Sequence, residues 1–118
     1  MQNESSLIIY QKYLDLIYYT NDIVKKYPKH ERFALVQETK SVLYEGVRYL
    51  VYAQNETDKI IRLNELKKLN ATLSILKLHI RLANKYTYIS LKNYESWSNK
   101  ITDVCNLLGA WIKSCAKK

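Results

Sequence analysis

The residues of this chain that could carry metal, nucleophilic or acid–base chemistry are few. His30 and His79 are its two histidines, and neither has a cysteine, a histidine or a carboxylate at metal-ligand spacing. A di-metal helical bundle needs Glu-x-x-His pairs, and neither histidine follows a glutamate at that spacing. Cys105 and Cys115 fall ten residues apart in one helical pattern, about 15 Å along the axis, so we expect two reduced thiols. The sequence therefore predicts no metal, no cofactor and no catalytic site, and a protein that is not an enzyme.

Length and composition narrow the class of protein further. The chain has 118 residues, two glycines, one proline, 47% hydrophobic residues and a formal charge of +8. Two glycines cannot build the glycine-rich loop that cradles a phosphate or dinucleotide. No apolar run reaches the roughly 18 residues of a membrane-spanning helix, and the polar segment 1–6 lacks the features of a secretory signal. We expect one soluble globular domain over residues 1–118, located in the cytoplasm.

The positive charge is concentrated in one segment. Residues 59–85 contain seven Lys or Arg and a single acid, Glu65. On a helical projection most of these cations share an arc about 100° wide that contains no acid. Lys77, Arg81 and Lys85 follow one another at i,i+4 spacing, a repulsive arrangement that a polyanion would relieve. A basic face that only keeps the protein solvated is the alternative. The predicted nucleic-acid or partner-binding residues are Lys59, Arg62, Lys67, Lys77, Arg81 and Lys85.

A second basic group surrounds the only proline. It consists of Lys25, Lys26, Lys29, His30 and Arg32. Here the structural interpretation is favoured, because Lys25 and Lys26 fall in the last turn of one predicted helix and Glu31 in the first turn of the next. Those are the ends at which positive and negative charge complement the helix dipole.

The few helix-breaking residues divide the chain into four long helices. The breaks fall at Tyr27-Pro28, at the capping residues 55–58, and at the aromatic and β-branched segment 86–89, which is the weakest of the three. The predicted helices cover about residues 5–26, 31–54, 58–85 and 90–116. Connections this short force neighbouring helices to run antiparallel, so the fold class is all-α, an up-down-up-down four-helix bundle.

Each predicted helix carries apolar residues at 3,4 spacing that indicate a core-facing seam. The seams are Leu7, Tyr10, Leu14, Ile17, Asn21 and Val24; Phe33, Val36, Lys40, Leu43, Val47 and Leu50; Leu66, Leu69, Leu73, Leu76, Ile80 and Ala83; and Tyr94, Trp97, Ile101, Val104, Leu108, Trp111 and Cys115.

The predicted helices at about 5–26 and 58–85 each carry a further apolar stripe beside the seam. A monomer would expose these stripes, and contiguous exposed apolar patches mark surfaces for self-association or for a protein partner. The alternative is that they are the margins of a wide core. The predicted oligomer interface consists of Ile9, Tyr13, Leu16, Ile61, Ile75, Leu78 and Leu82.

Two segments resemble a known group of small helical bundles. The turn and helix start at 27–37, Tyr-Pro-Lys-His-Glu-Arg-Phe-Ala-Leu-Val-Gln, is similar to the corresponding segment of proteins encoded by intervening sequences of bacterial 23S ribosomal RNA genes. Ile89-Ser90-x-Lys92-x-Tyr94 and the segment 107–113 resemble the accessory variability determinant of diversity-generating retroelements, whose tail has a Leu-Gly-Gly-Trp pattern. Ala110 stands at the second glycine, and the Ser-Ile-Pro and Asn-Ile-Ala-Glu-Gly segments typical of the intervening-sequence branch are missing. The retroelement branch is therefore favoured.

The resemblance implies more than the residues themselves do. It implies a homopentameric, barrel-like assembly of four-helix bundles with a basic surface that engages a reverse transcriptase and nucleic acid, RNA or DNA, with weak sequence specificity. A non-enzymatic accessory protein that supports mutagenic reverse transcription and retrohoming is the leading hypothesis. The alternative is an oligomeric structural bundle of the intervening-sequence type, with a protein partner and no role in nucleic-acid binding.

Overall fold

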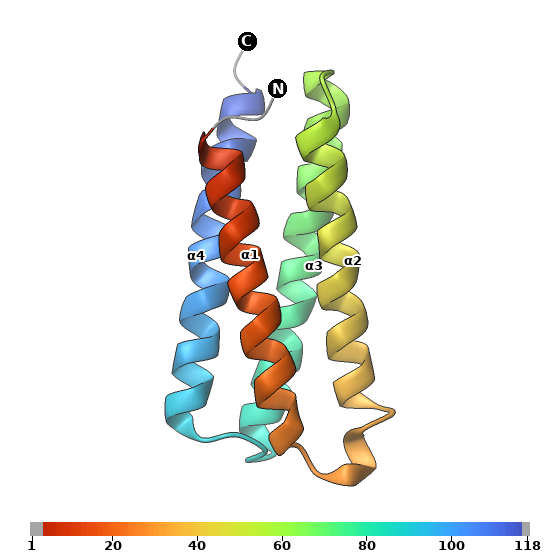
Figure 1. The fold of residues 1–118 in the computed structure, drawn as a ribbon, viewed down its shortest axis with the longest axis vertical. Coiled ribbons are helices and arrows are strands. Elements are labelled where there is room, and N and C mark those ends of the chain that lie inside the picture. The colour runs from red at the N-terminus through yellow and green to blue at the C-terminus, as the bar shows by residue number, and fades with distance from the viewer. Residues whose placement is uncertain (1–3, 117–118) are drawn as a thin grey trace.

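Four long helices form the chain, and each runs antiparallel to the next (Figure 1). The computed structural model describes residues 4–116, with α1 at Glu4–Ile23, α2 at Leu35–Asn55, α3 at Lys59–Lys85 and α4 at Leu91–Ala116. Each helix packs against the one that follows it, and α4 also packs against α1 to close the bundle. The prediction of an all-α, up-down-up-down four-helix bundle is confirmed.

The connection between α1 and α2 is longer than expected, because both helices are shortened there. A 3-10 turn at Val24–Lys26 follows α1, and a second one covers Lys29–Glu31. Pro28 lies between them with extended backbone angles. The carboxylate of Glu31 accepts a hydrogen bond of 3.3 Å from the backbone N–H of Leu35, where α2 begins. The second helix therefore starts four residues after the predicted position, and Glu31 caps it from outside.

The seams predicted for α3 and α4 are almost entirely correct. All six seam residues of α3, from Leu66 to Ala83, are buried, and so are the six of α4 from Trp97 to Cys115. Tyr94 is the exception, because it is half-buried at the edge of the core. Asp58 fixes the start of α3 by accepting hydrogen bonds from the backbone N–H groups of Ile60 and Ile61, at 2.8 and 3.1 Å.

The seam predicted for the first helix is largely wrong, although its last residue, Val24, is buried as expected. Ile9, Tyr13 and Leu16, which we expected to form an exposed oligomer contact, are fully buried in the core of a single bundle. Leu7, expected in the core, is 49% exposed instead. Two buried polar residues, Ser6 and Thr20, complete the true seam at 3,4 spacing. Helix α1 is thus rotated so that Leu7 and Tyr10 are exposed, while Leu14 and Ile17 lie half-buried at the margin of the core.

The seam predicted for α2 is also partly wrong. Phe33 is 82% exposed and precedes the helix. The buried positions of α2 include three that are not apolar: Thr39, Gly46 and Gln54. Gln54 donates a hydrogen bond of 2.9 Å to the backbone carbonyl of Ser6, so its polar side chain is satisfied inside the bundle.

His79 gives the bundle a pH-dependent stability. Burial against α2 lowers its pKa below the ordinary 6.5, an effect that nearby Glu38 opposes. The unfolded chain therefore binds a proton at higher pH than the folded chain, so the free energy of unfolding should fall as pH drops below about 7. Urea unfolding at pH 7.5 and pH 5.5 measures this fall, which should be smaller for His79→Gln. Equal falls in the two chains would contradict the prediction.

The turn between α3 and α4 contains the one left-handed non-glycine residue among residues 4–116. Thr87 has φ 58°, the backbone N–H of Thr87 donates to the carbonyl of Asn84, and that of Tyr88 donates to Ala83. Together these bonds close the end of α3 in the arrangement in which glycine is usually found at the left-handed position. The sequence signal for this boundary was weak for that reason.

Thr87→Gly is expected to stabilise the bundle. A β-branched residue in the left-handed region costs about 1–2 kcal/mol, whereas glycine adopts it without a steric penalty. Part of the gain is offset by the greater freedom of glycine in the unfolded chain, so we expect the free energy of unfolding to rise by about 1 kcal/mol. Chemical denaturation measures the change, and Thr87→Ala, which keeps a Cβ, is the matched control. A lower stability for Thr87→Gly would show that the conformation is not strained.

Candidate nucleic-acid interface

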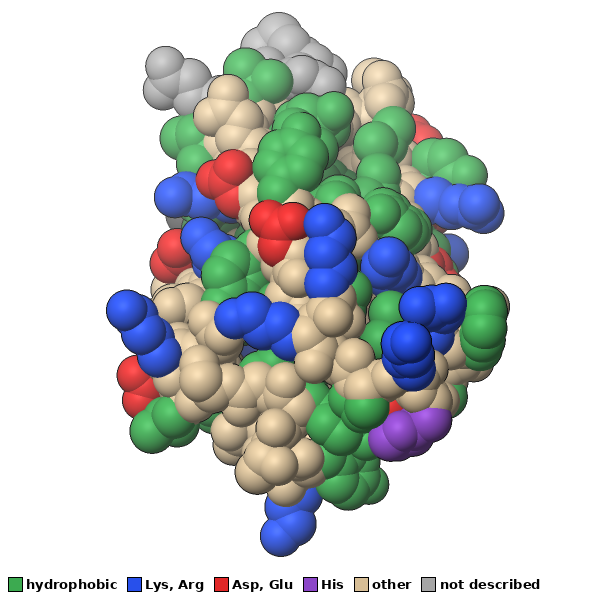
Figure 2. Space-filling view, turned by 60° about the horizontal axis from the view of Figure 1, so that its bottom comes forward, with side chains coloured by type: hydrophobic (Ala, Val, Ile, Leu, Met, Phe, Trp, Pro, Cys, Tyr) green, Lys and Arg blue, Asp and Glu red, His purple; other side chains and the backbone are tan. Residues whose placement is uncertain are grey.

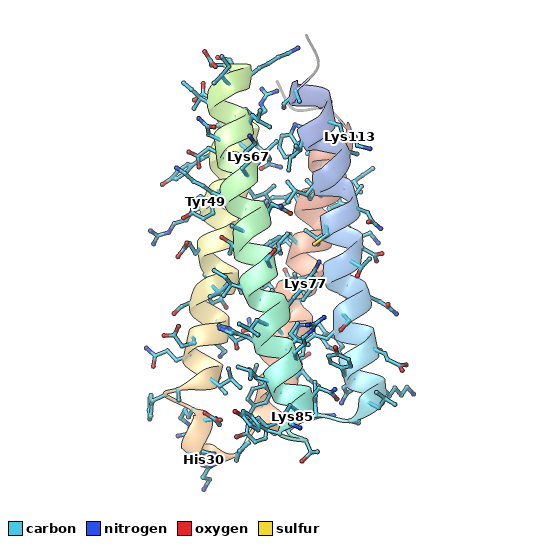
Figure 3. All side chains as sticks on the ribbon, turned by 180° about the vertical axis from the view of Figure 1, so that it is seen from behind. His30, Tyr49, Lys67, Lys77, Lys85 and Lys113 are labelled. Carbon is cyan, nitrogen blue, oxygen red and sulfur yellow. The ribbon has the colours of Figure 1, made fainter. Side chains whose placement is uncertain are left out.

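The basic residues of α3 lie on the side of the helix that faces α4. The buried seam of α3 fixes the rotation of this helix, and Lys59, Lys67, Lys77, Arg81 and Lys85 then fall in one arc beside that seam. All five are exposed. Lys67, Lys77 and Lys85 are spread along α3 in Figure 3, over about 27 Å at the helical rise. We call these five residues the α3 basic track.

The middle of the α3 basic track borders a pocket between α3 and α4. This pocket has a volume of about 260 Å³. Lys77 and Arg81 line it from α3, and Tyr94, Ser98 and Thr102 line it from α4. None of the three α4 residues is charged, so no carboxylate in the lining opposes the two cations. The phenol ring of Tyr94 is half-buried at the same place, next to both cations.

The cations of the track are not neutralised within the bundle. In the part of the chain that the structure describes, ion pairs join Lys25 to Asp22 and Lys68 to Glu65, and no other pair is within 4.0 Å. Lys68 belongs to the opposite side of α3, where its ammonium also lies 5.9 Å from the ring centre of Tyr49 on α2. The one acid in residues 59–85 is thus paired away from the track.

Arg62 is set apart from the other predicted binding residues. Its guanidinium donates two hydrogen bonds to the backbone carbonyl of Glu56, one of them 3.0 Å long from Nε. Arg62 is half-buried there, and it closes the turn between α2 and α3. We therefore leave Arg62 out of the α3 basic track.

The second predicted apolar stripe is exposed as expected on α3. Ile61 and Ile75 are both 48% exposed and Leu78 is 56% exposed, whereas Leu82 is half-buried. On α1 the exposed apolar residues are Leu7 and Tyr10, which the sequence assigned to the core, and Ile8 and Tyr18, which it did not. Tyr44 on α2 is exposed too, and its hydroxyl accepts a hydrogen bond of 3.0 Å from Asn21. The uncovered apolar surface of α1 is therefore not confined to the stripe predicted for the core.

The structure also shows how the possible metal ligands and the cysteines are arranged in residues 4–116. No three His, Cys, Asp or Glu side chains in that range lie close enough to hold a metal ion together. Both cysteines are free thiols, Cys105 half-buried and Cys115 buried. Across the same range, every helix is too short or too polar to cross a membrane.

The sequence predicted the cations of the candidate interface but not the residues on its α4 side. Tyr94 was assigned to the core, and Ser98 and Thr102 carried no signal. These residues are positioned by the packing of α4 on α3, which a single-helix pattern does not contain. Ser98 and Thr102 directly follow the seam residues Trp97 and Ile101. That position would have indicated them only if the side of α4 that packs on α3 were known.

The fold and its interface define a class of protein: a small, basic, antiparallel four-helix bundle with a cationic seam. The family model described as bAvd-like matches residues 7–115, nearly the whole chain, and the chain belongs to that family. It is an Avd-type accessory protein, as the resemblance in the sequence indicated. A search of curated proteins found no match.

Proposed function

We propose that this protein is a non-enzymatic accessory factor of a diversity-generating retroelement. In this proposal it binds the reverse transcriptase and nucleic acid, template RNA or cDNA, in the cytoplasm, and supports mutagenic reverse transcription and retrohoming. Family membership supports the accessory role. The observation that carries the binding role is the α3 basic track, five exposed cations with no ion-pair partner in the described residues.

The chemistry of the track favours the sugar-phosphate backbone as its ligand. Lys and Arg side chains bind phosphate oxygens and release counterions from the nucleic acid, which gives affinity without reading the sequence. Tyr94, at the pocket that Lys77 and Arg81 line, adds a ring on which an unpaired base can stack. A single strand can offer its phosphates and an unstacked base together, so we expect single-stranded RNA to bind better than a duplex.

The exposed apolar residues support self-association. We infer that the bundles assemble into a homopentamer, a number that comes from the family resemblance and not from the bundle itself. The surfaces available for such contacts are the exposed side of α1 with Leu7 and Tyr10 and the outer face of α3 with Ile75 and Leu78. Burying them between subunits would remove apolar surface from water and repeat the basic track around the assembly.

A structural bundle that binds a protein partner is the second candidate. The exposed face of α3 favours it, because Ile75 and Leu78 could be covered by another protein as well as by another subunit. In that case the α3 basic track would serve solubility alone, and the protein would bind no nucleic acid.

Binding measured across a salt series tests the proposal. The purified protein is titrated with single-stranded RNA, and with a reverse transcriptase–template RNA complex, while light scattering gives its mass in solution. For direct RNA binding we expect the log of the affinity to fall linearly with the log of the salt concentration. Binding only when the polymerase is present would make the track a protein-docking surface. Binding to neither would support the structural bundle instead.

A further inference from the structure

The turn between α1 and α2 forms a second basic site, away from the α3–α4 seam. A cavity of about 670 Å³ lies there. Lys25, Lys29, Arg32 and Lys40 line it, over an apolar floor that includes Tyr27 and Val36. No acid is among the lining residues. The turn is at the lower end of the bundle in Figure 1, and Figure 2, which brings that end forward, shows Lys and Arg side chains gathered on it.

Most of these cations lack a counter-ion. Lys25 pairs with Asp22 at 3.7 Å, but within residues 4–116 no carboxylate lies within 4.0 Å of Lys29, Arg32 or Lys40. Glu31 is adjacent in sequence to this group, yet its carboxylate accepts hydrogen bonds from the Tyr88 hydroxyl at 2.7 Å and from the N–H of Leu35 at 3.3 Å. Glu31 therefore does not pair with Lys29, Arg32 or Lys40, and these cations remain available to an anion.

Lys40 is the residue that helix capping does not explain. It lies in the second turn of α2, and it is half-buried rather than free in solvent. Lys40 lines the cavity, and within the described residues no carboxylate lies within 4.0 Å of its ammonium. An anion in the cavity would give this ammonium a charge-assisted hydrogen bond. The sequence assigned Lys40 to the core seam of α2, and the capping interpretation, which covered Lys25, Lys26 and Glu31, does not extend to it.

We propose that this cavity binds a nucleoside phosphate with two or more phosphate groups. Its volume is in the range of small-molecule sites, about 300–1,000 Å³. Lys and Arg are the side chains that bind phosphate oxygens, and the several unpaired cations favour a ligand with several negative charges. The apolar lining residues, which include Pro28 and Val36, offer the base a contact surface. A free nucleotide and the 5′-triphosphate end of an RNA share this chemistry.

Titration of the purified protein with ATP, followed by calorimetry at low salt, tests this proposal. We expect saturable binding of one ATP per chain, with adenosine and inorganic triphosphate each binding at least about tenfold more weakly. Arg32→Ala combined with Lys40→Ala should weaken ATP binding at least about tenfold. Lys12→Ala combined with Lys92→Ala removes two exposed positive charges that line none of the pockets, and this variant should leave ATP binding unchanged.

Three results would overturn the proposal: no saturable binding, equal losses in the two double variants, or inorganic triphosphate binding as well as ATP. Circular dichroism of both double variants checks that the helices are intact. Whether the ligand is a free nucleotide or the 5′ end of an RNA is then decided with one RNA that carries either a 5′-triphosphate or a 5′-hydroxyl. A preference for the triphosphate end that Arg32→Ala/Lys40→Ala abolishes assigns the site to RNA ends, and the absence of a preference assigns it to free nucleotides. Neither result depends on the α3 basic track.

Discussion

A chain in which Lys77 and Arg81 are both replaced by glutamate is expected to bind single-stranded RNA at least about tenfold more weakly than the unaltered chain. Both side chains line the α3–α4 pocket, and no carboxylate pairs with either within the described residues. Reversing them removes two phosphate contacts and places two negative charges in the path of the strand. The salt dependence should change too, because each lost phosphate contact lowers the slope of log affinity against log salt by about one.

The control for this prediction separates local contacts from net charge. Lys12 on α1 and Lys92 on α4 are exposed and line none of the pockets described above. The double variant Lys12→Glu/Lys92→Glu changes the net charge by the same amount, and we expect a much smaller loss of affinity. Equal losses in the two double variants would mean that RNA binds the overall positive charge and not the track. Circular dichroism should show the same helix content in both, because all four residues are exposed.

Tyr94 provides a separate test of the same surface. Tyr94→Leu keeps an apolar side chain at the edge of the core but removes the aromatic face, and base stacking is worth about 1–3 kcal/mol. We expect single-stranded RNA to bind about tenfold more weakly, with an unchanged salt slope, because no phosphate contact is lost. Fluorescence anisotropy with a labelled oligonucleotide measures both quantities. A loss that appears only as a changed slope would exclude stacking.

The helices and two of the four seams could be predicted because the information is local. The leucines of α3 and the apolar residues of α4 recur at 3,4 spacing without a competing stripe of comparable strength in the core. In α1 two apolar stripes compete, and the buried one contains Ser6 and Thr20. Thr20 is tolerated in the core because its hydroxyl accepts a hydrogen bond of 3.0 Å from the indole N–H of Trp97. That partner is 77 residues away in sequence, so no local pattern reveals it.

The candidate sites also differ in how much of each could be predicted from the sequence. The α3 basic track follows from helical periodicity and the charge of one segment, and the sequence contains both. The pocket at Tyr94 and the cavity at Lys40 depend on which faces of two helices meet, and they emerge only when the bundle is assembled. Lys40 shows the difference most directly, since its spacing placed it in the core seam of α2 whereas it lines the cavity at the α1–α2 turn.

Gly46 is where the packing of α1 against α2 leaves no room for a side chain. A Cβ added there would lie 2.0 Å from the hydroxyl oxygen of Tyr13 and 3.2 Å from a methyl group of Leu69. The Tyr13 hydroxyl is buried and donates a hydrogen bond of 2.6 Å to the backbone carbonyl of Leu43. Burial also raises the pKa of Tyr13, so the phenol stays protonated and can donate throughout the physiological pH range.

Gly46→Ala is therefore expected to lower the free energy of unfolding by about 2 kcal/mol. The added methyl group displaces the Tyr13 hydroxyl, so overpacking costs about 1–3 kcal/mol and the broken buried hydrogen bond costs about 1 kcal/mol more. The better helix propensity of alanine returns about 1 kcal/mol, which is not enough to reverse the sign. Urea denaturation measures the change. Gly109→Ala is the matched control, because a Cβ there meets nothing within 4 Å, and it should stabilise the chain by up to about 1 kcal/mol.

A double-mutant cycle with Tyr13→Phe assigns the cost to the hydroxyl. Without the oxygen, the contact at 2.0 Å is gone, although the ring carbon at 3.0 Å still limits the space. We expect Gly46→Ala to cost less than about 1 kcal/mol in the Tyr13→Phe chain, a coupling of at least about 1 kcal/mol between the two positions. Additive effects would show that Tyr13 does not press against Gly46. The same cycle tests whether Tyr13 is buried inside the bundle. A Tyr13 that faced outward into an oligomer contact could not couple to Gly46 within one bundle.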